Sequence, residues 1–149
     1  MRLISADDGT IWLITKHSRR YAAEELKKLK KHRFVKILAA ETDGKVVGFC
    51  VVWIIPPEAE LHYIEIFKPF RKRGFGKLLL KNLQRYLKEV GVEKLYLEVS
   101  EKNTVAVELY RKSGFETVGK RKNYYGEGED AILMKKTISL PNREGDLRC

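Results

Sequence analysis

The chain of 149 residues lacks the features that mark several classes of protein. It has two cysteines, Cys50 inside an apolar run and Cys149 at the last position, which suggest neither a disulfide framework nor a cysteine metal site. No apolar run approaches the length of a membrane span, and the first residues contain no apolar signal-peptide core. We therefore expect one cytoplasmic domain that binds neither a membrane nor a metal.

The two best-known glycine motifs for nucleotides are also missing. Residues 71–76 read RKRGFG, but Leu79 stands where a dinucleotide-binding fingerprint needs its third glycine. No Gly-Lys-Ser/Thr follows a four-residue gap, which excludes the phosphate-binding loop of NTPases. The stretch still lies between a strand-like and a helix-like segment, where glycines and free helix N–H groups favour anions. It is either a pyrophosphate-binding turn or an ordinary basic turn.

Glutamine is nearly absent, with Gln84 alone, whereas basic residues are in excess. There are 30 Lys and Arg against 20 Asp and Glu, which gives a net charge of +10. The positive charges gather in residues 16–36, 68–77 and 120–122. Such a surface attracts nucleic acid, the ribosome or an anionic cofactor. A composition rich in Lys and Glu is also typical of heat-stable proteins.

The hydrophobic pattern predicts a mixed α/β domain. Residues 1–15 hold two apolar patches around a turn signal at 7–9, which indicates a hairpin or a strand followed by an extended segment. Residues 18–32 predict one helix, capped by Ser18. Strands are expected at 34–41, 45–55, 59–67, 94–100, 115–119 and 131–138, helices from the glycine turn to about 90 and at 103–112, and a loop at 123–130. Hairpins followed by helix, strand, helix and hairpin do not make a regular β-α-β array.

Two motifs, in order and at the right spacing, resemble the GNAT superfamily of N-acetyltransferases, which use acetyl-CoA. The cofactor motif Q/R-x-x-G-x-G/A is matched by Arg71, Gly74 and Gly76. The motif N-x-x-A-x-x-L-Y-x-x-x-G-F is matched by Asn103, Ala106, Leu109, Tyr110, Gly114 and Phe115. The resemblance covers residues 34–138. It implies a GNAT-like α/β fold, with a mixed, mostly antiparallel central sheet flanked by helices, as a single domain over 1–140 with a flexible tail at 141–149.

Within the superfamily the chain most resembles the bacterial ribosomal-protein alanine N-acetyltransferases. The similar segments are LEV at 97–99, RKNYY at 121–125 and EDAILM at 129–134. The resemblance implies acetyl transfer from acetyl-CoA to the N-terminal α-amine of a protein, without need of nucleic acid. Two departures concern the acceptor: Tyr63 replaces the usual asparagine, and one helix is predicted before the first long hairpin where the family has two. A lysine, a small amine, or a non-catalytic CoA-holding module on the ribosome or RNA therefore stay open.

The same resemblance implies the residues of the site. Glu98 is the leading general base and Glu65 its competitor. Tyr110 is the general acid, because a phenol with a pKa near 10 is protonated at pH 7. Tyr124 and Tyr125 are expected to line the peptide groove.

The residues expected to bind acetyl-CoA lie on one strand, the turn after it and one later helix start: Ile64, Glu65, Ile66, Arg71, Lys72, Arg73, Gly74, Phe75, Gly76, Lys77 and Asn103. The turn would hold the pyrophosphate, and the strand would offer backbone groups to the pantetheine arm. One backbone N–H, plausibly that of Ile66, would polarise the thioester carbonyl.

Overall fold

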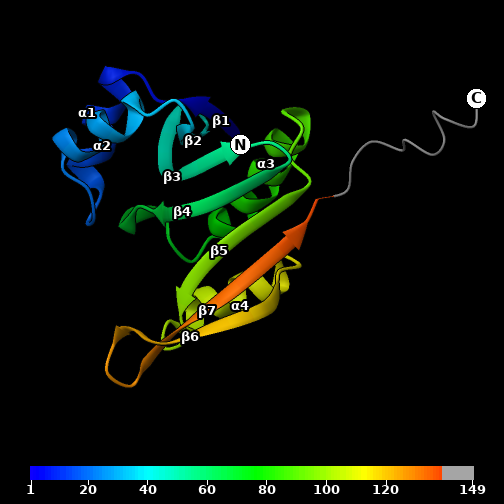
Figure 1. The fold of residues 1–149 in the computed structure, drawn as a ribbon. Helices are drawn as coiled ribbons and strands as arrows, with labels where there is room; N and C mark the ends of the chain where they lie inside the picture. Colours follow the sequence, from blue (N-terminus) through cyan, green and yellow to red (C-terminus); the bar gives the residue numbers. More distant parts are fainter. Residues whose placement is uncertain (139–149) are drawn as a thin grey trace, which may run out of the picture.

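A seven-stranded sheet organises residues 1–138, which are the part of the chain that the computed structural model describes (Figure 1). The strand order across the sheet is β1-β2-β3-β4-β5-β7-β6, and every neighbouring pair is antiparallel except β4 with β5. The strands are β1 (Arg2–Ser5), β2 (Val35–Thr42), β3 (Lys45–Ile55), β4 (Glu58–Ile66), β5 (Lys94–Ser100), β6 (Glu116–Gly126) and β7 (Glu129–Thr137). The mixed, mostly antiparallel sheet predicted from the sequence is confirmed.

Helices cover the two faces of this sheet unequally (Figure 1). On one face, α1 (Asp8–His17) and α2 (Ala23–Lys31) pack over β2 and β3 and bury Ile11, Ile14 and Leu26. On the other face lie α3 (Phe75–Glu89) and α4 (Thr104–Lys112). A short 3-10 helix, η1 (Lys68–Phe70), connects β4 to the turn before α3. Within the described residues, no helix is long and apolar enough to cross a membrane.

The larger core lies between the sheet and α3. The helix α3 contributes four fully buried leucines, Leu79, Leu80, Leu83 and Leu87, of which Leu83 lies three or four residues from each of the other three. That spacing is the apolar stripe of an amphipathic helix. Each such side chain contributes about 1.5–3 kcal/mol when it is buried. The stripe therefore fixes α3 against the sheet, with its N-terminus beside the end of β4.

The N-terminal region differs from the sequence prediction. Residues 8–17, expected as part of a hairpin or an extended segment, form α1 instead. The carboxylate of Asp7 accepts a hydrogen bond from the Thr10 backbone N–H at 2.8 Å, which caps the helix and lowers the pKa of Asp7. Ile11 and Ile14 lie three residues apart and are fully buried, so the apolar patch is one face of a helix.

The predicted helix at 18–32 is also wrong at its start. Ser18 terminates α1, and α2 begins at Ala23, with Ala22 as its N-cap residue. Two helices therefore precede β2, and the expectation of only one is wrong. Both helices that the family resemblance implies before the first long hairpin are therefore present.

The later elements follow the prediction more closely. β3 and β5 have the predicted bounds, and α4 begins after its predicted cap, Asn103. The expected loop at 123–130 is mostly strand, because β6 continues to Gly126 and β7 starts at Glu129. The register of this hairpin is irregular between Arg121 and Gly126, which explains why the pattern looked like a loop. The predicted tail at 141–149 lies outside the described residues.

Replacing Gly9 tests the corrected N-terminal element. Gly9 lies in the first turn of α1, without a positive φ and with no atom closer than 3.6 Å to an added Cβ. We expect Gly9→Ala to raise the free energy of unfolding by about 0.5–1 kcal/mol, because alanine loses less entropy in a helix. Gly44→Ala, at φ +75° in the β2–β3 turn, should lower it. Urea unfolding measures both, and a destabilising Gly9→Ala would contradict the helix.

Candidate active site

The two central parallel strands separate halfway along their length. The last pair between them is Leu61 with Leu97, although β4 continues to Ile66 and β5 to Ser100. Each strand stays paired on its outer side, β4 with β3 and β5 with β7. The inner edge of β4 is therefore unpaired after Leu61 and that of β5 after Leu97, so the sheet opens as a V.

A β-bulge lies at the point of separation. Val52 pairs with Leu61 and Val51 pairs with Tyr63, so His62 has no partner on β3. A bulge bends its strand and increases the local twist. It also shifts the alternation of side chains by one residue, which turns Tyr63 toward the face covered by α1 and α2.

The gap between the strands is a cleft of about 520 Å³. Its walls come from residues 62–66 of β4, residues 98–100 of β5, Gly76 of α3 and one side of α4 from Val105 to Tyr110. Arg19, from the segment between α1 and α2, and Tyr125, from the β6–β7 hairpin, complete it. The cleft therefore brings together elements from both faces of the sheet.

Backbone groups of β4 point into this cleft. The Phe67 N–H donates to the Val47 carbonyl at 2.8 Å, and hydrogen-bonded positions alternate in an antiparallel ladder. By that alternation the N–H groups of Ile64 and Ile66 face away from β3, toward the open gap. The Ile66 carbonyl, on the same edge, accepts a hydrogen bond from Arg71 Nε at 2.8 Å. A bound molecule with amide groups finds the partners that a neighbouring strand would otherwise supply.

The turn after β4 is suited to an anion. Gly74 caps α3 with φ +81°, in the left-handed region that favours glycine, and the first turn of α3 contains no acidic residue. The cationic residues Lys72, Arg73 and Lys77 are exposed around this helix start. Free N–H groups and the helix dipole favour a phosphate there. Gly76 faces the cleft, where an added Cβ would lie 3.4 Å from Leu109.

The Arg71 side chain points back to β4, unlike the exposed basic side chains beside it. Besides its bond to the Ile66 carbonyl, its guanidinium lies 3.8 Å from the buried Glu65 carboxylate. It therefore connects the turn to β4 rather than extending into solvent. Of the predicted cofactor residues, the cleft is lined by Ile64, Glu65, Ile66, Arg71, Gly76 and Asn103. The others lie beside it, in the turn (Lys72, Arg73 and Gly74) or in the first turn of α3 (Phe75 and Lys77).

Glu65 is surrounded by hydrogen-bond donors. Its side chain is 1% exposed and accepts from Ser18 Oγ and Tyr63 Oη, both at 2.9 Å, and from the Arg19 N–H at 3.3 Å. These donors occupy the lone pairs that a general base needs. The arrangement holds the segment after α1 against β4, and it argues against Glu65 as the base.

Glu98 occupies the opposite wall with a more open environment. Its side chain is 22% exposed and forms an ion pair with Arg121, 3.1 Å from Nη2 to Oε1. It shares a sheet face with Tyr96 and Ser100, opposite to the buried Leu97 and Val99. That is also the face of Tyr63 and Glu65, so the two carboxylates border the same side of the cleft.

Tyr110 reaches the cleft from α4, on the other face of the sheet. It is 7% exposed, packs on Phe115 at 5.6 Å between ring centroids, and burial raises its pKa to about 12. Its phenol therefore keeps its proton at neutral pH. Tyr63 has a pKa of about 12 as well, mainly from burial and also from its bond to Glu65.

Sequence reasoning missed part of the site. Ser18, Arg19 and Tyr63 were not predicted to contact Glu65, which lies 47 residues from Ser18 and 46 from Arg19. Tyr63 had one available signal, since it precedes Glu65 by two residues on a predicted strand and shares its face. Within residues 1–138, no group of three or more His, Cys, Asp or Glu could hold a metal ion.

An open V between parallel strands, with a helix start suited to an anion at one end, fits an extended cofactor that carries phosphate groups. The model of the acetyltransferase (GNAT) family matches residues 4–115, and the chain belongs to this family. It is an N-acetyltransferase that uses acetyl-CoA, and the non-catalytic alternative is set aside.

Individual proteins resemble the chain over most of its length. The [ribosomal protein bS18]-alanine N-acetyltransferase of Haemophilus influenzae is 40% identical over 113 residues, or 73% of this chain and 76% of that protein. An N-alpha-acetyltransferase of Sulfurisphaera tokodaii is 34% identical over 127 residues, or 76% and 74%. The crystal structure of the ribosomal-protein-S18-alanine N-acetyltransferase from Escherichia coli aligns with a TM-score of 0.79 and 25% identity, over 95% of this chain and 96% of that chain.

Replacing Tyr110 tests its buried phenol. Below about pH 10 the folded and unfolded chains both hold the proton, so no pH dependence arises from Tyr110 there. Above pH 10 only the unfolded chain loses it, until the folded pKa of about 12 is reached. The free energy of unfolding of the wild type should therefore fall, relative to Tyr110→Phe, by about 1.4 kcal/mol per pH unit between pH 10 and 12. Urea unfolding at several pH values measures the difference; parallel curves would contradict the raised pKa.

Proposed function

We propose that this enzyme acetylates the N-terminal α-amine of a protein, with a small ribosomal protein as the best candidate. The observation that carries the proposal is the meeting of Glu98 and Tyr110 at one cleft, from β5 and α4. The names of the relatives support it, because two of them act on alanine of a ribosomal protein and a third is an N-alpha-acetyltransferase. A ribosomal-protein acceptor also implies action in the cytoplasm.

Acetyl-CoA would enter from the side of α3 and α4. Its pyrophosphate would bind the N–H groups at the start of α3, with Lys72, Arg73 and Lys77 around it. Its pantetheine arm would complete the open edge of β4, and the Ile66 N–H would polarise the thioester carbonyl. Asn103, whose side chain caps α4 through the Ala106 N–H at 3.2 Å, would contact the cofactor from the other wall.

The acceptor amine would approach from the opposite face, beside Glu98. A protein α-amine with a pKa near 7.8 is roughly 10–15% neutral at pH 7, whereas a lysine with a pKa near 10.4 is below about 0.1% neutral. That difference corresponds to about 3.5 kcal/mol. A partly exposed carboxylate paired with Arg121, acting directly or through water, therefore suits an α-amine better than a lysine.

The amine nitrogen would form the new bond to the acetyl carbon, and the bond from that carbon to sulfur would break. One amine proton goes to Glu98. The departing thiolate receives a hydrogen bond from the Tyr110 phenol, which stabilises the charge that develops on sulfur. A phenol with a pKa of about 12 is a weak acid, so its main contribution is this hydrogen bond rather than complete proton transfer.

The acceptor class is tested by thiol release from acetyl-CoA with three substrates. These are a peptide with a free N-terminal alanine, the same peptide with a blocked N-terminus and an internal lysine, and a polyamine. We expect turnover on the first alone. Preferred turnover on the lysine peptide or the polyamine would overturn the proposed acceptor.

The catalytic roles are tested in the same assay. Glu98→Gln should lower kcat by about 100-fold or more and Tyr110→Phe by about 10-fold or more, since general acid–base groups contribute typically 10²–10⁴-fold. The matched controls are Glu116→Gln, on the exposed side of β6, and Tyr86→Phe, on α3 outside the cleft. A kcat within twofold of wild type for Glu98→Gln would remove it as the base.

A further inference from the structure

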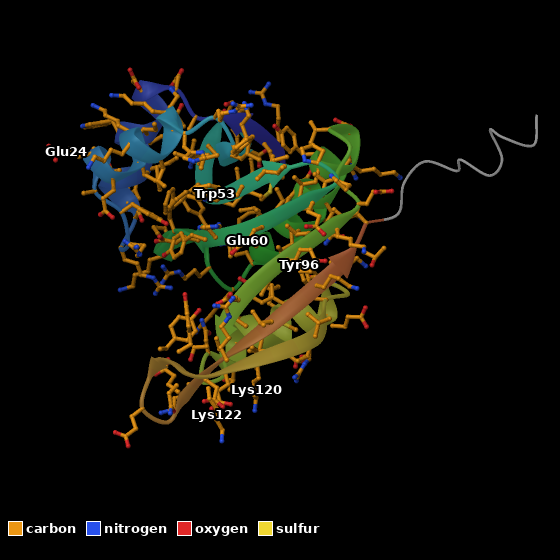
Figure 2. The ribbon with its side chains drawn as sticks, viewed as in Figure 1. Glu24, Trp53, Glu60, Tyr96, Lys120 and Lys122 are labelled. Atoms are coloured by element: carbon orange, nitrogen blue, oxygen red, sulfur yellow. The ribbon has the colours of Figure 1, made fainter. Side chains whose placement is uncertain are left out.

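A second hollow lies on the acceptor side of the sheet, outside the cleft. It has a volume of about 290 Å³ and is lined by Trp53 and Ile55 of β3, Glu58 and Glu60 of β4, and Tyr96 of β5, over the backbone at Ala59. Figure 2 shows Trp53, Glu60 and Tyr96 in a row across β3, β4 and β5. In Figure 1, α1 and α2 lie toward the β1–β3 side of this face and leave the part over β4 and β5 open.

The register of the sheet explains why these side chains gather. Trp53 pairs with Glu60 across β3 and β4, and Glu60 pairs with Tyr96 across β4 and β5. Paired residues point to the same face, so the Glu60 carboxylate lies between two aromatic rings. The rings are two strand spacings apart, roughly 10 Å, which leaves room for a flat cationic group above the carboxylate.

The charge of the hollow is opposite to that of the protein. Glu58 accepts a hydrogen bond from Tyr96 Oη at 3.4 Å, and Glu60 has His62 Nε2 at 3.6 Å. Within residues 1–138, neither carboxylate has a lysine or arginine nitrogen within 4.0 Å, although the chain holds 30 such residues. Lys94 is the register partner of Glu58 and Lys135 that of Tyr96, so both lysines share this face, but no lysine nitrogen lies within 4.0 Å of either carboxylate in residues 1–138. Aromatic rings beside carboxylates that have no lysine or arginine partner are surroundings that bind a guanidinium or ammonium group.

The hollow continues into the cleft. The His62 ring lines the cleft and stacks on Trp53, with 5.2 Å between centroids and 21° between planes. Tyr96 and Glu98 lie two residues apart on the same face of β5, which is a distance of about 7 Å. An extended peptide advances 3.3–3.6 Å per residue. A chain whose amine lies at Glu98 therefore reaches the hollow at its third or fourth residue.

We propose that the hollow of Trp53, Glu58, Glu60 and Tyr96 binds a basic side chain, arginine above all, at position 3 or 4 of the acceptor polypeptide. The proposal rests on the proposed function, because it needs a peptide in the cleft. It also predicts that the enzyme selects among acceptors. With a net charge of +10, the field of the whole protein repels a basic peptide, so a preference for arginine has to come from a local site.

Peptides with a single arginine at positions 2 to 7, and one without arginine, test the proposal by kcat/KM. We expect a gain of about 10-fold over the neutral peptide at position 3 or 4, mainly in KM, and little gain at positions 6 and 7. The double variant Glu58→Gln/Glu60→Gln should remove that gain and change the neutral peptide less than twofold. Glu24→Gln, an exposed change on α2 far from the hollow in Figure 2, is the matched control. An equal gain in kcat/KM at every position, or a gain that remains in the double variant, would contradict the proposed arginine site.

A binding measurement separates this proposal from the proposed function. The chain has two tryptophans, so Trp12→Phe leaves Trp53 as the sole indole reporter. An N-blocked peptide with arginine at position 3 should change its fluorescence in a saturable way, and Glu58→Gln/Glu60→Gln should abolish the change. A saturable change in Trp53 fluorescence without turnover on any peptide would support the arginine site and contradict the proposed function. Turnover that does not depend on arginine, without any change in fluorescence, would support the proposed function and contradict the arginine site.

Discussion

The separation of β4 from β5 is the constraint on which the rest of the site depends. A bulge at His62 follows the last pair of the parallel ladder, Leu61 with Leu97, and bends β4 away from its neighbour. The backbone groups released there would be costly if they stayed unpaired in a dry interior. The enzymes of this family use acetyl-CoA, and we propose that it supplies the missing partner of β4. Each of the two strands leads to a helix beside the V: β4 is followed by η1, the glycine turn and α3, and β5 is followed by α4.

The same bulge determines which side chains of β4 point to each face of the sheet. It turns Tyr63 and Glu65 toward α1 and α2, while Ile64 and Ile66 face α3 and α4. The face of α1 and α2 therefore carries Tyr63 and Glu65, and we propose that the acceptor binds on this face and acetyl-CoA on the other. Glu65 connects two loops, because its buried carboxylate contacts Ser18 and Arg19 of the segment after α1 and also Arg71 of the turn after β4. We interpret it as a positioning residue that fixes both loops to β4.

How much of this follows from the sequence depends on the range of the interactions. Strands 45–55 and 94–100 were predicted because alternation and turn residues are local, and the glycine turn and Asn103 because motifs are local. The N-terminal region failed because Asp7 caps a helix as readily as it starts a turn, and because Ser18 serves Glu65 on a distant strand instead of capping α2. The hollow at Trp53 depends on the register of three strands, which hydrophobic pattern alone does not fix.

The central claim is that acetyl-CoA completes the open edge of β4, and amide hydrogen exchange resolved by residue tests it most directly. The amides of Ile64 and Ile66 should exchange fast in the free protein and become protected when acetyl-CoA is added. The amides of Tyr63 and Glu65, which face β3, should be protected in both states and serve as the internal control. Protection of Ile64 and Ile66 that is already present without the cofactor, or that does not change when it binds, would contradict the account.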